Sequence, residues 1–153
     1  MTIWAIDPGP HTGIFYMKGL EPCRVTLDYT DGLVHRPHEH LYLWLLQNID
    51  PANDTIVYEP FEFRKEERDR EYINYQAAEF VGVIALFCDL TNTAGVRQMA
   101  AQVMSFWEDD KLKRVGLYVP GKERRHERDA TRHWLHYVSF YLHDNYWVSK
   151  LKR

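Results

Sequence analysis

Residues 3–15 read IWAIDPGPHTGIF, and this stretch decides the fold. Apolar side chains occupy both alternating faces of residues 2–7, which is the pattern of a central strand covered on two sides. A proline- and glycine-rich turn follows Asp7 directly and is short enough for a hairpin into a second strand over residues 12–18. The chain therefore begins with a buried strand that ends on a carboxylate.

The remaining pattern predicts three further strands and three helices. We expect strands over residues 23–29, 55–59 and 95–99, and helices over 38–49, 72–90 and about 123–146. A length of 153 residues suits one domain with a real core and a single active site. We therefore expect one α/β domain over residues 1–153, with a five-stranded mixed sheet and flanking helices.

Composition limits the function classes. Hydrophobic residues make up 45% of the chain and charged residues 27%, which is typical of a globular domain and argues against long-range disorder. The formal net charge is −3, so any surface that binds nucleic acid has to be a local one.

The cysteines and the longest apolar run indicate the compartment. Cys23 and Cys88 lie far apart in apolar surroundings, and the N-terminus has no secretory leader, so we expect reduced thiols in a cytoplasmic protein. The run FVGVIALFC at 80–88 is about half of the ~20 residues that span a bilayer, so no membrane segment is expected.

Acidic residues end two of the predicted strands. Asp7 closes the first strand and Glu59 closes the strand over 55–59, and parallel neighbours would bring these ends to one edge of the sheet. Two carboxylates at that distance repel unless a cation lies between them. The terminal helix places Asp129 and His126 on its apolar face, where an ionisable pair needs a partner. The residues expected on this face also include Ala130, His133, Trp134, Tyr137 and Tyr141.

Structural alternatives exist for each of these residues. An aspartate before Pro-Gly is a common turn former, and His126 lies in the charged stretch KERRHERD, which is consistent with a solvated surface. His133 has two candidate roles, a hydrogen bond to a metal-bound group or packing in the core, and we expect packing. Gly9 is expected to make the turn tight and to let a phosphate backbone come close.

Three motifs resemble the RuvC-type Holliday junction resolvases. IDPGPHTG at 6–13 resembles the N-terminal motif of that family, VYEPF at 57–61 its second acidic strand, and HERDAT at 126–131 its C-terminal acidic helix. The resemblance implies an RNase H-like fold and a homodimer that cuts branched DNA, such as a four-way junction, with Mg²⁺ or Mn²⁺. The short, divergent chain looks like the phage-encoded branch of the family.

The resemblance also implies roles for individual residues. Asp7, Glu59 and Asp129 match the metal-binding acids of the family, and His126 falls where many members have a further aspartate and some a histidine. Two cations per active site, held by acids from different elements, can activate a water and stabilise the leaving oxygen. Because Mg²⁺ prefers oxygen ligands, an imidazole at His126 should raise the relative tolerance for Mn²⁺.

Two basic groups are candidate DNA contacts. Behind Glu59, aromatic and basic side chains alternate in PFEFRKEERDR, which is either an aromatic wedge beside phosphate contacts or an ordinary solvated loop. The resemblance implies that a phenylalanine of this stretch probes the centre of the junction, and either Phe61 or Phe63 is a candidate for it. The candidates in this stretch are Phe61, Phe63, Arg64, Lys65 and Arg68, and those flanking the acids are Lys122, Arg124, Arg125, Arg128 and Arg132.

One departure from the family concerns a basic residue. The family often has one after AAQV, where this chain has Met104, and Lys111, Lys113 or Arg114 is a candidate substitute for that charge. The helix over 72–90 is apolar on more than one face and is a candidate dimer surface.

The function expected from these residues is metal-dependent hydrolysis of branched DNA. An actin-like ATPase or sugar kinase shares the aspartate–glycine–threonine loop, but it needs a second lobe that one domain of this length does not supply. Two alternatives remain open from the sequence. One is an RNase H-like nuclease acting on flaps or RNA–DNA hybrids, and the other is a non-catalytic module that binds DNA structures.

Overall fold

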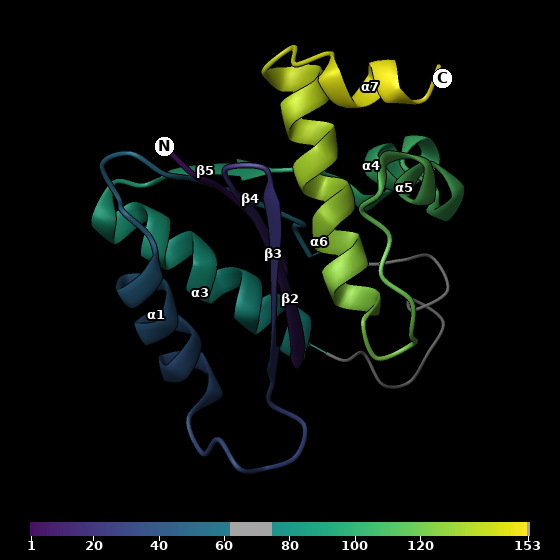
Figure 1. Ribbon diagram of the computed structural model, residues 1–153. Coiled ribbons are helices and arrows are strands. Elements are labelled where there is room, and N and C mark those ends of the chain that lie inside the picture. Colours follow the sequence, from purple (N-terminus) through teal and green to yellow (C-terminus); the bar gives the residue numbers. More distant parts are fainter. Residues whose placement is uncertain (62–74, 153) are drawn as a thin grey trace.

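The computed structural model describes residues 1–61 and 75–152, and it contains a five-stranded mixed sheet with helices on both faces (Figure 1). The strands are β1 (Ile3–Asp7), β2 (His11–Lys18), β3 (Glu21–Asp28), β4 (Thr55–Tyr58) and β5 (Ala94–Arg97). The helices are α1 (Pro37–Asn48), α3 (Gln76–Thr91), α4 (Ala100–Phe106), α5 (Asp109–Val115), α6 (Arg125–His136) and α7 (Tyr146–Lys150), with a π-helical turn η1 (Tyr137–Tyr141) after α6.

The sheet has the order β3-β2-β1-β4-β5. The first three strands form an antiparallel meander, and β1 pairs with β4 in parallel, as β4 does with β5. This arrangement confirms the expected mixed sheet and places β1 at its centre.

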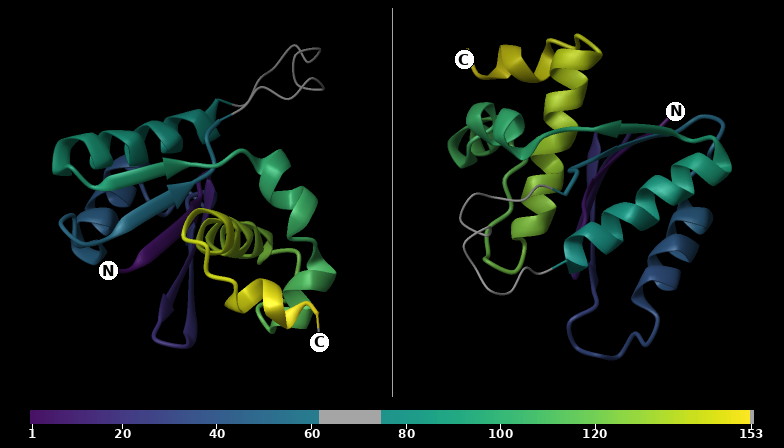
Figure 2. Two further views of the ribbon diagram at one scale, coloured as in Figure 1. Left: turned by 90° about the horizontal axis from the view of Figure 1, so that it is seen from above. Right: turned by 180° about the vertical axis from the view of Figure 1, so that it is seen from behind.

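Two layers of helices cover the sheet. α1 and α3 lie on one face, and α6 crosses the other face with α4, α5 and α7 beyond it (Figures 1 and 2). Alternate residues of β1 supply the two cores: Trp4 and Ile6 pack with α1 and α3, whereas Ala5 packs with Trp134 of α6. The two-sided apolar pattern of residues 2–7 is thereby explained.

The observed elements differ from the predicted ones mainly in the second half of the chain. The predicted helix 123–146 is divided, since α6 ends at His136 and the π-helical turn follows, so that Tyr141 is 53% exposed rather than on the core face. The short helices α4, α5 and α7 were not predicted, because five to seven residues are too few to show a 3.6-residue period. No helix in residues 1–61 or 75–152 is both long and apolar enough to cross a membrane.

Candidate active site

The carboxyl ends of β1 and β4 meet at one edge of the sheet. Because these strands are parallel, with Ile6 opposite Tyr58, the next residues Asp7 and Glu59 come to the same edge. The Glu59 backbone N–H also donates to the Ile6 carbonyl at 3.4 Å. The expectation that two strand-end carboxylates share this edge is confirmed.

The α6 helix reaches the same edge through a close backbone contact at Gly13. A Cβ atom on Gly13 of β2 would lie 2.2 Å from the backbone carbonyl carbon and oxygen of His126. Gly9, in contrast, has room for a Cβ, whose nearest neighbour would be a carbonyl oxygen at 3.7 Å. The glycine that the protein's own packing requires is therefore Gly13, whereas the turn has room for a side chain at Gly9. The close approach of a phosphate backbone to Gly9 stays a prediction.

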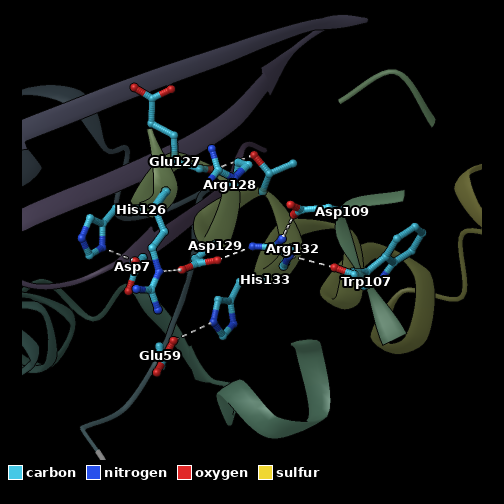
Figure 3. Close-up of polar contacts among 12 residues, drawn as sticks. Asp7, Glu59, Trp107, Asp109, His126, Glu127, Arg128, Asp129, Arg132 and His133 are labelled. Carbon is cyan, nitrogen blue, oxygen red and sulfur yellow. Dashed lines mark hydrogen bonds and ion pairs between the residues drawn. The ribbon is translucent and has the colours of Figure 1, made fainter. Parts of the chain in front are cut away.

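One cavity of about 580 Å³ is lined by all four predicted site residues, namely Asp7, Glu59, His126 and Asp129 (Figure 3). Its wall also contains three arginines, two further acids and two apolar side chains, namely Arg125, Arg128, Arg132, Glu108, Asp109, Ala100 and Met104. Acids from β1, from the end of β4 and from α6 thus converge from distant parts of the sequence.

Asp7 is buried and is paired with a histidine. Burial raises the pKa of the Asp7 carboxyl; the hydrogen bond and charge of His126 oppose this shift, and the charges of Asp129 and Glu59 reinforce it. His126 Nδ1 lies 2.6 Å from Asp7 Oδ2, and this hydrogen bond raises the pKa of His126. The His126 side chain remains 36% exposed and its ring stacks against His11.

Asp129 is held by two arginines. Arg132 is only 11% exposed and makes ion pairs with Asp129 and with Asp109, while its Nε donates to the Trp107 carbonyl at 2.8 Å (Figure 3). Arg125 Nε lies 3.6 Å from Asp129 Oδ2, and its side chain is 65% exposed. The cavity wall around Asp129 is therefore a network of alternating charges.

Glu59 is paired with His133, which sequence reasoning had assigned to packing. His133 is fully buried, as packing would require, but its Nε2 also lies 3.3 Å from Glu59 Oε2. The prediction was thus incomplete, because a helix position one turn after Asp129 reaches the same strand ends.

The donor set fits a divalent cation in chemical type. Asp7, Glu59 and Asp129 offer the carboxylate oxygens that Mg²⁺ and Mn²⁺ prefer. Burial raises the pKa of Asp7, and the charges of Asp129 and Glu59 add to this effect. Among residues 1–61 and 75–152, no three His, Cys, Asp or Glu side chains stand close enough to hold one ion in this arrangement. Each carboxylate instead contacts its own basic side chain.

Comparison with known proteins finds similarity in structure. No family model matches the sequence, and no curated protein does. A solved structure titled "T. thermophilus RuvC in complex with Holliday junction substrate" superposes with a TM-score of 0.66 and 14% identity, covering 94% of this chain and 96% of that one. The chain has the RuvC fold. A second structure, "Thermus thermophilus RuvC structure", gives a TM-score of 0.62 at 14% identity over 87% and 90% of the two chains.

This likeness to RuvC confirms the predicted RNase H-like class. At 14% identity it establishes the fold alone, and the phage origin stays a prediction.

Five of the basic residues predicted to contact DNA line the cavity of the acids or the hollow beside it. Arg128 and Arg132 line the 580 Å³ cavity. Lys122 and Arg124 line an adjoining hollow of about 340 Å³. Arg125, like His126, lines both. Several of these cations also have partners within the protein: Arg124 pairs with Glu127, and Arg128 donates to two backbone carbonyls.

The other predicted contacts are placed less completely. Phe61 is the last residue described before the gap, and the predicted contacts Phe63, Arg64, Lys65 and Arg68 lie outside the described residues. Met104 lines the cavity, whereas the three candidates for the missing charge line a different hollow, with Glu108 and Asp110. These three are Lys111, Lys113 and Arg114.

Sequence reasoning missed three polar residues at the site. Glu108 and Asp109 enter the cavity wall at the start of α5, and Gln98 contacts His133 directly after β5. The acidic run in WEDDKLKR is a helix-start signal that could have located α5, but nothing in the sequence indicates that α5 packs beside α6.

Proposed function

We propose that the protein is a metal-dependent endonuclease that cuts branched DNA, in the first place the four-way junction. The supporting observation is that three carboxylates, from β1, the end of β4 and α6, line one arginine-rich cavity of a RuvC fold. A fold hosts many functions, so the proposal depends on this site and not on the fold.

Asp7, Glu59 and Asp129 would hold Mg²⁺ or Mn²⁺, two ions per active site, with His126 completing or bordering the set. Such ions, when bound, supply an activated water and stabilise the leaving oxygen of the phosphodiester. Arg125 and Arg128 in the same wall would bind the phosphates of the scissile strand. Lys122 and Arg124 in the adjoining hollow would extend this contact along the DNA backbone.

We also propose a homodimer, formed through the α1 and α3 side of the sheet. These helices lie side by side (Figure 1), and each exposes large apolar side chains. The exposed leucines are Leu43 and Leu46 of α1 and Leu86 and Leu90 of α3. A four-way junction requires two symmetric cuts, which a two-fold dimer supplies.

Cleavage of a substrate panel tests the nuclease proposal. The protein is incubated with labelled four-way, three-way, flap, linear and RNA–DNA hybrid substrates, with Mg²⁺, Mn²⁺ or EDTA. We expect metal-dependent cuts in the four-way junction, and at least about a hundredfold loss of rate in Asp7→Asn. The matched control is Asp31→Asn, the same chemical change at an exposed position, which should cut normally. Binding without cleavage under all conditions would contradict the proposal and favour a DNA-binding module.

A further inference from the structure

A buried polar chain connects β5, α6 and the end of β4. His133 is fully buried and Gln98 is 2% exposed. His133 Nδ1 lies 3.2 Å from the side-chain oxygen Oε1 of Gln98, and His133 Nε2 lies 3.3 Å from Glu59 Oε2. The Glu59 side chain at the end of this chain of contacts is 21% exposed. Burying polar groups such as those of His133 and Gln98 is costly unless their donors and acceptors match, so the direction of each hydrogen bond is constrained.

The backbone fixes both ends of this chain. The Gln98 N–H donates to the Tyr58 carbonyl at 3.0 Å, one residue before Glu59. His133 comes from α6, one turn after Asp129, and points toward Glu59 from the other side (Figure 3). The His133 imidazole therefore links α6, which carries Asp129, to the sheet edge that carries Glu59.

The protons can be assigned from the chemistry of the groups. An ionised carboxylate only accepts, so the bond to Glu59 requires a proton on His133 Nε2. In a neutral imidazole Nδ1 is then an acceptor, and it needs a donor. The amide nitrogen of Gln98 is buried and has no hydrogen-bond partner within the described part of the chain. Turning this amide by 180° about its last bond brings that nitrogen to Nδ1, so that the buried Gln98 nitrogen and His133 Nδ1 become each other's partners.

We propose that Gln98 and His133 are positioning residues for Glu59. The Gln98 amide nitrogen donates to His133 Nδ1, and His133 Nε2–H donates to Glu59 Oε2, which leaves Oε1 available to a divalent cation. Hydrogen bonds of this kind fix the orientation of metal-binding carboxylates and so favour binding. This inference rests on the proposed role of Glu59 in holding a cation.

The two histidines near the acids thereby differ in kind. His126 is partly exposed and lines both hollows, whereas His133 is enclosed and contacts Glu59 without entering the cavity wall. A residue in the position of His133 acts through Glu59 and not on the substrate.

Nitrogen-15 NMR of the metal-free protein tests the proton assignment. We expect His133 to show the Nε2–H tautomer, and Gln98→Leu to disturb the His133 signals while leaving those of His136 in place. A pure Nδ1–H tautomer in the wild type would overturn the proposal, because Nε2 would then face the carboxylate without a proton.

Mn²⁺ binding to the same protein tests the positioning role. Titration followed by electron paramagnetic resonance should show about 10- to 100-fold weaker binding in His133→Leu, the range usual for loss of such a contact. His133→Gln keeps an amide donor near the place of Nε2 and should restore most of the affinity. His136→Leu is the matched control on the same helix and should bind Mn²⁺ like the wild type.

The outcomes separate this proposal from the nuclease proposal. Wild-type affinity in both His133→Leu and Gln98→Leu, with folding confirmed by circular dichroism, would overturn the positioning role even if the wild type cuts junctions. Equal loss in His133→Leu and His133→Gln would overturn it as well, since the donor would then be irrelevant. The expected Mn²⁺ series in a protein that cuts no DNA would support the positioning role and contradict only the nuclease proposal.

Discussion

Two buried aspartates lie at opposite ends of the parallel pair β1 and β4, and their surroundings differ. Asp54, just before β4, accepts hydrogen bonds from the Thr2 N–H at 2.7 Å, the Trp4 indole at 2.9 Å and the Asp50 N–H at 3.1 Å. Burial acts to raise the pKa of Asp54, but these donors outweigh it and the pKa is lowered. At the other end, burial is the largest influence on Asp7, whose pKa is raised.

The difference separates a carboxylate that is fixed within the fold from one that lies in the proposed metal site. We call the end of the strand pair with Asp54 the structural end and the end with Asp7 the proposed functional end. Asp54 joins the chain start, β1 and the α1–β4 connection through fixed donors, so its charge stabilises the fold. Asp7 faces two other carboxylates and, within the described residues, has His126 as its side-chain partner. A charge left in such surroundings is typical of a site that is completed by a bound ion.

The largest predicted effect on stability is at Gly13, where β2 meets α6 beside the acids. Gly13→Ala would place a methyl group 2.2 Å from the His126 backbone, so that the start of α6 and its acids must shift. We expect a loss of about 3 kcal/mol or more in the free energy of unfolding. Urea denaturation measures this loss, and junction cleavage should fall with it.

Gly9→Ala is the matched control for Gly13→Ala. A Cβ at Gly9 meets nothing closer than 3.7 Å, so this variant should unfold within about 0.5 kcal/mol of the wild type. Equal destabilisation by the two substitutions would contradict the close contact between β2 and α6.

The second effect is at the structural end. In Asp54→Asn an amide group replaces one carboxylate oxygen, so at least one of the N–H donors of Thr2, Trp4 or Asp50 faces another donor. We expect a loss of about 1–3 kcal/mol in unfolding free energy, because a buried donor loses a charged acceptor. Asp31→Asn in an exposed loop should leave the midpoint of urea denaturation unchanged.

The third prediction has the opposite sign and lies at the proposed functional end. Asp7→Asn removes a charge that repels Asp129 and Glu59, so the metal-free protein should unfold at the same free energy or up to about 1 kcal/mol higher. Mn²⁺ should raise the melting temperature of the wild type, by the equivalent of about 2.7 kcal/mol at 100 times Kd, and much less in Asp7→Asn. Destabilisation of the metal-free variant as large as that of Asp54→Asn would remove the distinction between the two ends.

The local sequence pattern predicts the positions of Asp7 and Glu59 better than the role of Asp54. The apolar strands that end at Asp7 and Glu59 are visible in sequence, and their shared edge follows from a parallel crossover. Asp54 has no such signal, because its partner Thr2 lies 52 residues away and an aspartate after an asparagine is also an ordinary turn residue.

The parts of the site that sequence did not predict depend on tertiary packing. Asp109 reaches Arg132 across 23 residues because the short helix α5 packs beside α6, and Gln98 reaches His133 across 35 residues through the position of β5. Neither contact is signalled by a periodic pattern or a motif in the sequence, because each depends on how two distant elements pack together. Gly13 is visible in the motif at 6–13, but only the approach of α6 explains why it must be glycine.

The smallest predicted effect is on acid sensitivity, and here the two aspartates should again differ in sign. The pKa of Asp54 is lowered from its ordinary value of 3.8, so its stabilisation is complete above about pH 5 and is lost as the pH falls through the lowered pKa. The pKa of Asp7 is raised, so protonation on acidification favours the folded state at that end. Urea midpoints between pH 7 and pH 3 should therefore fall less steeply in Asp54→Asn than in the wild type, and more steeply in Asp7→Asn. Parallel curves for all three proteins would mean that neither carboxylate differs in proton affinity between the folded and unfolded states.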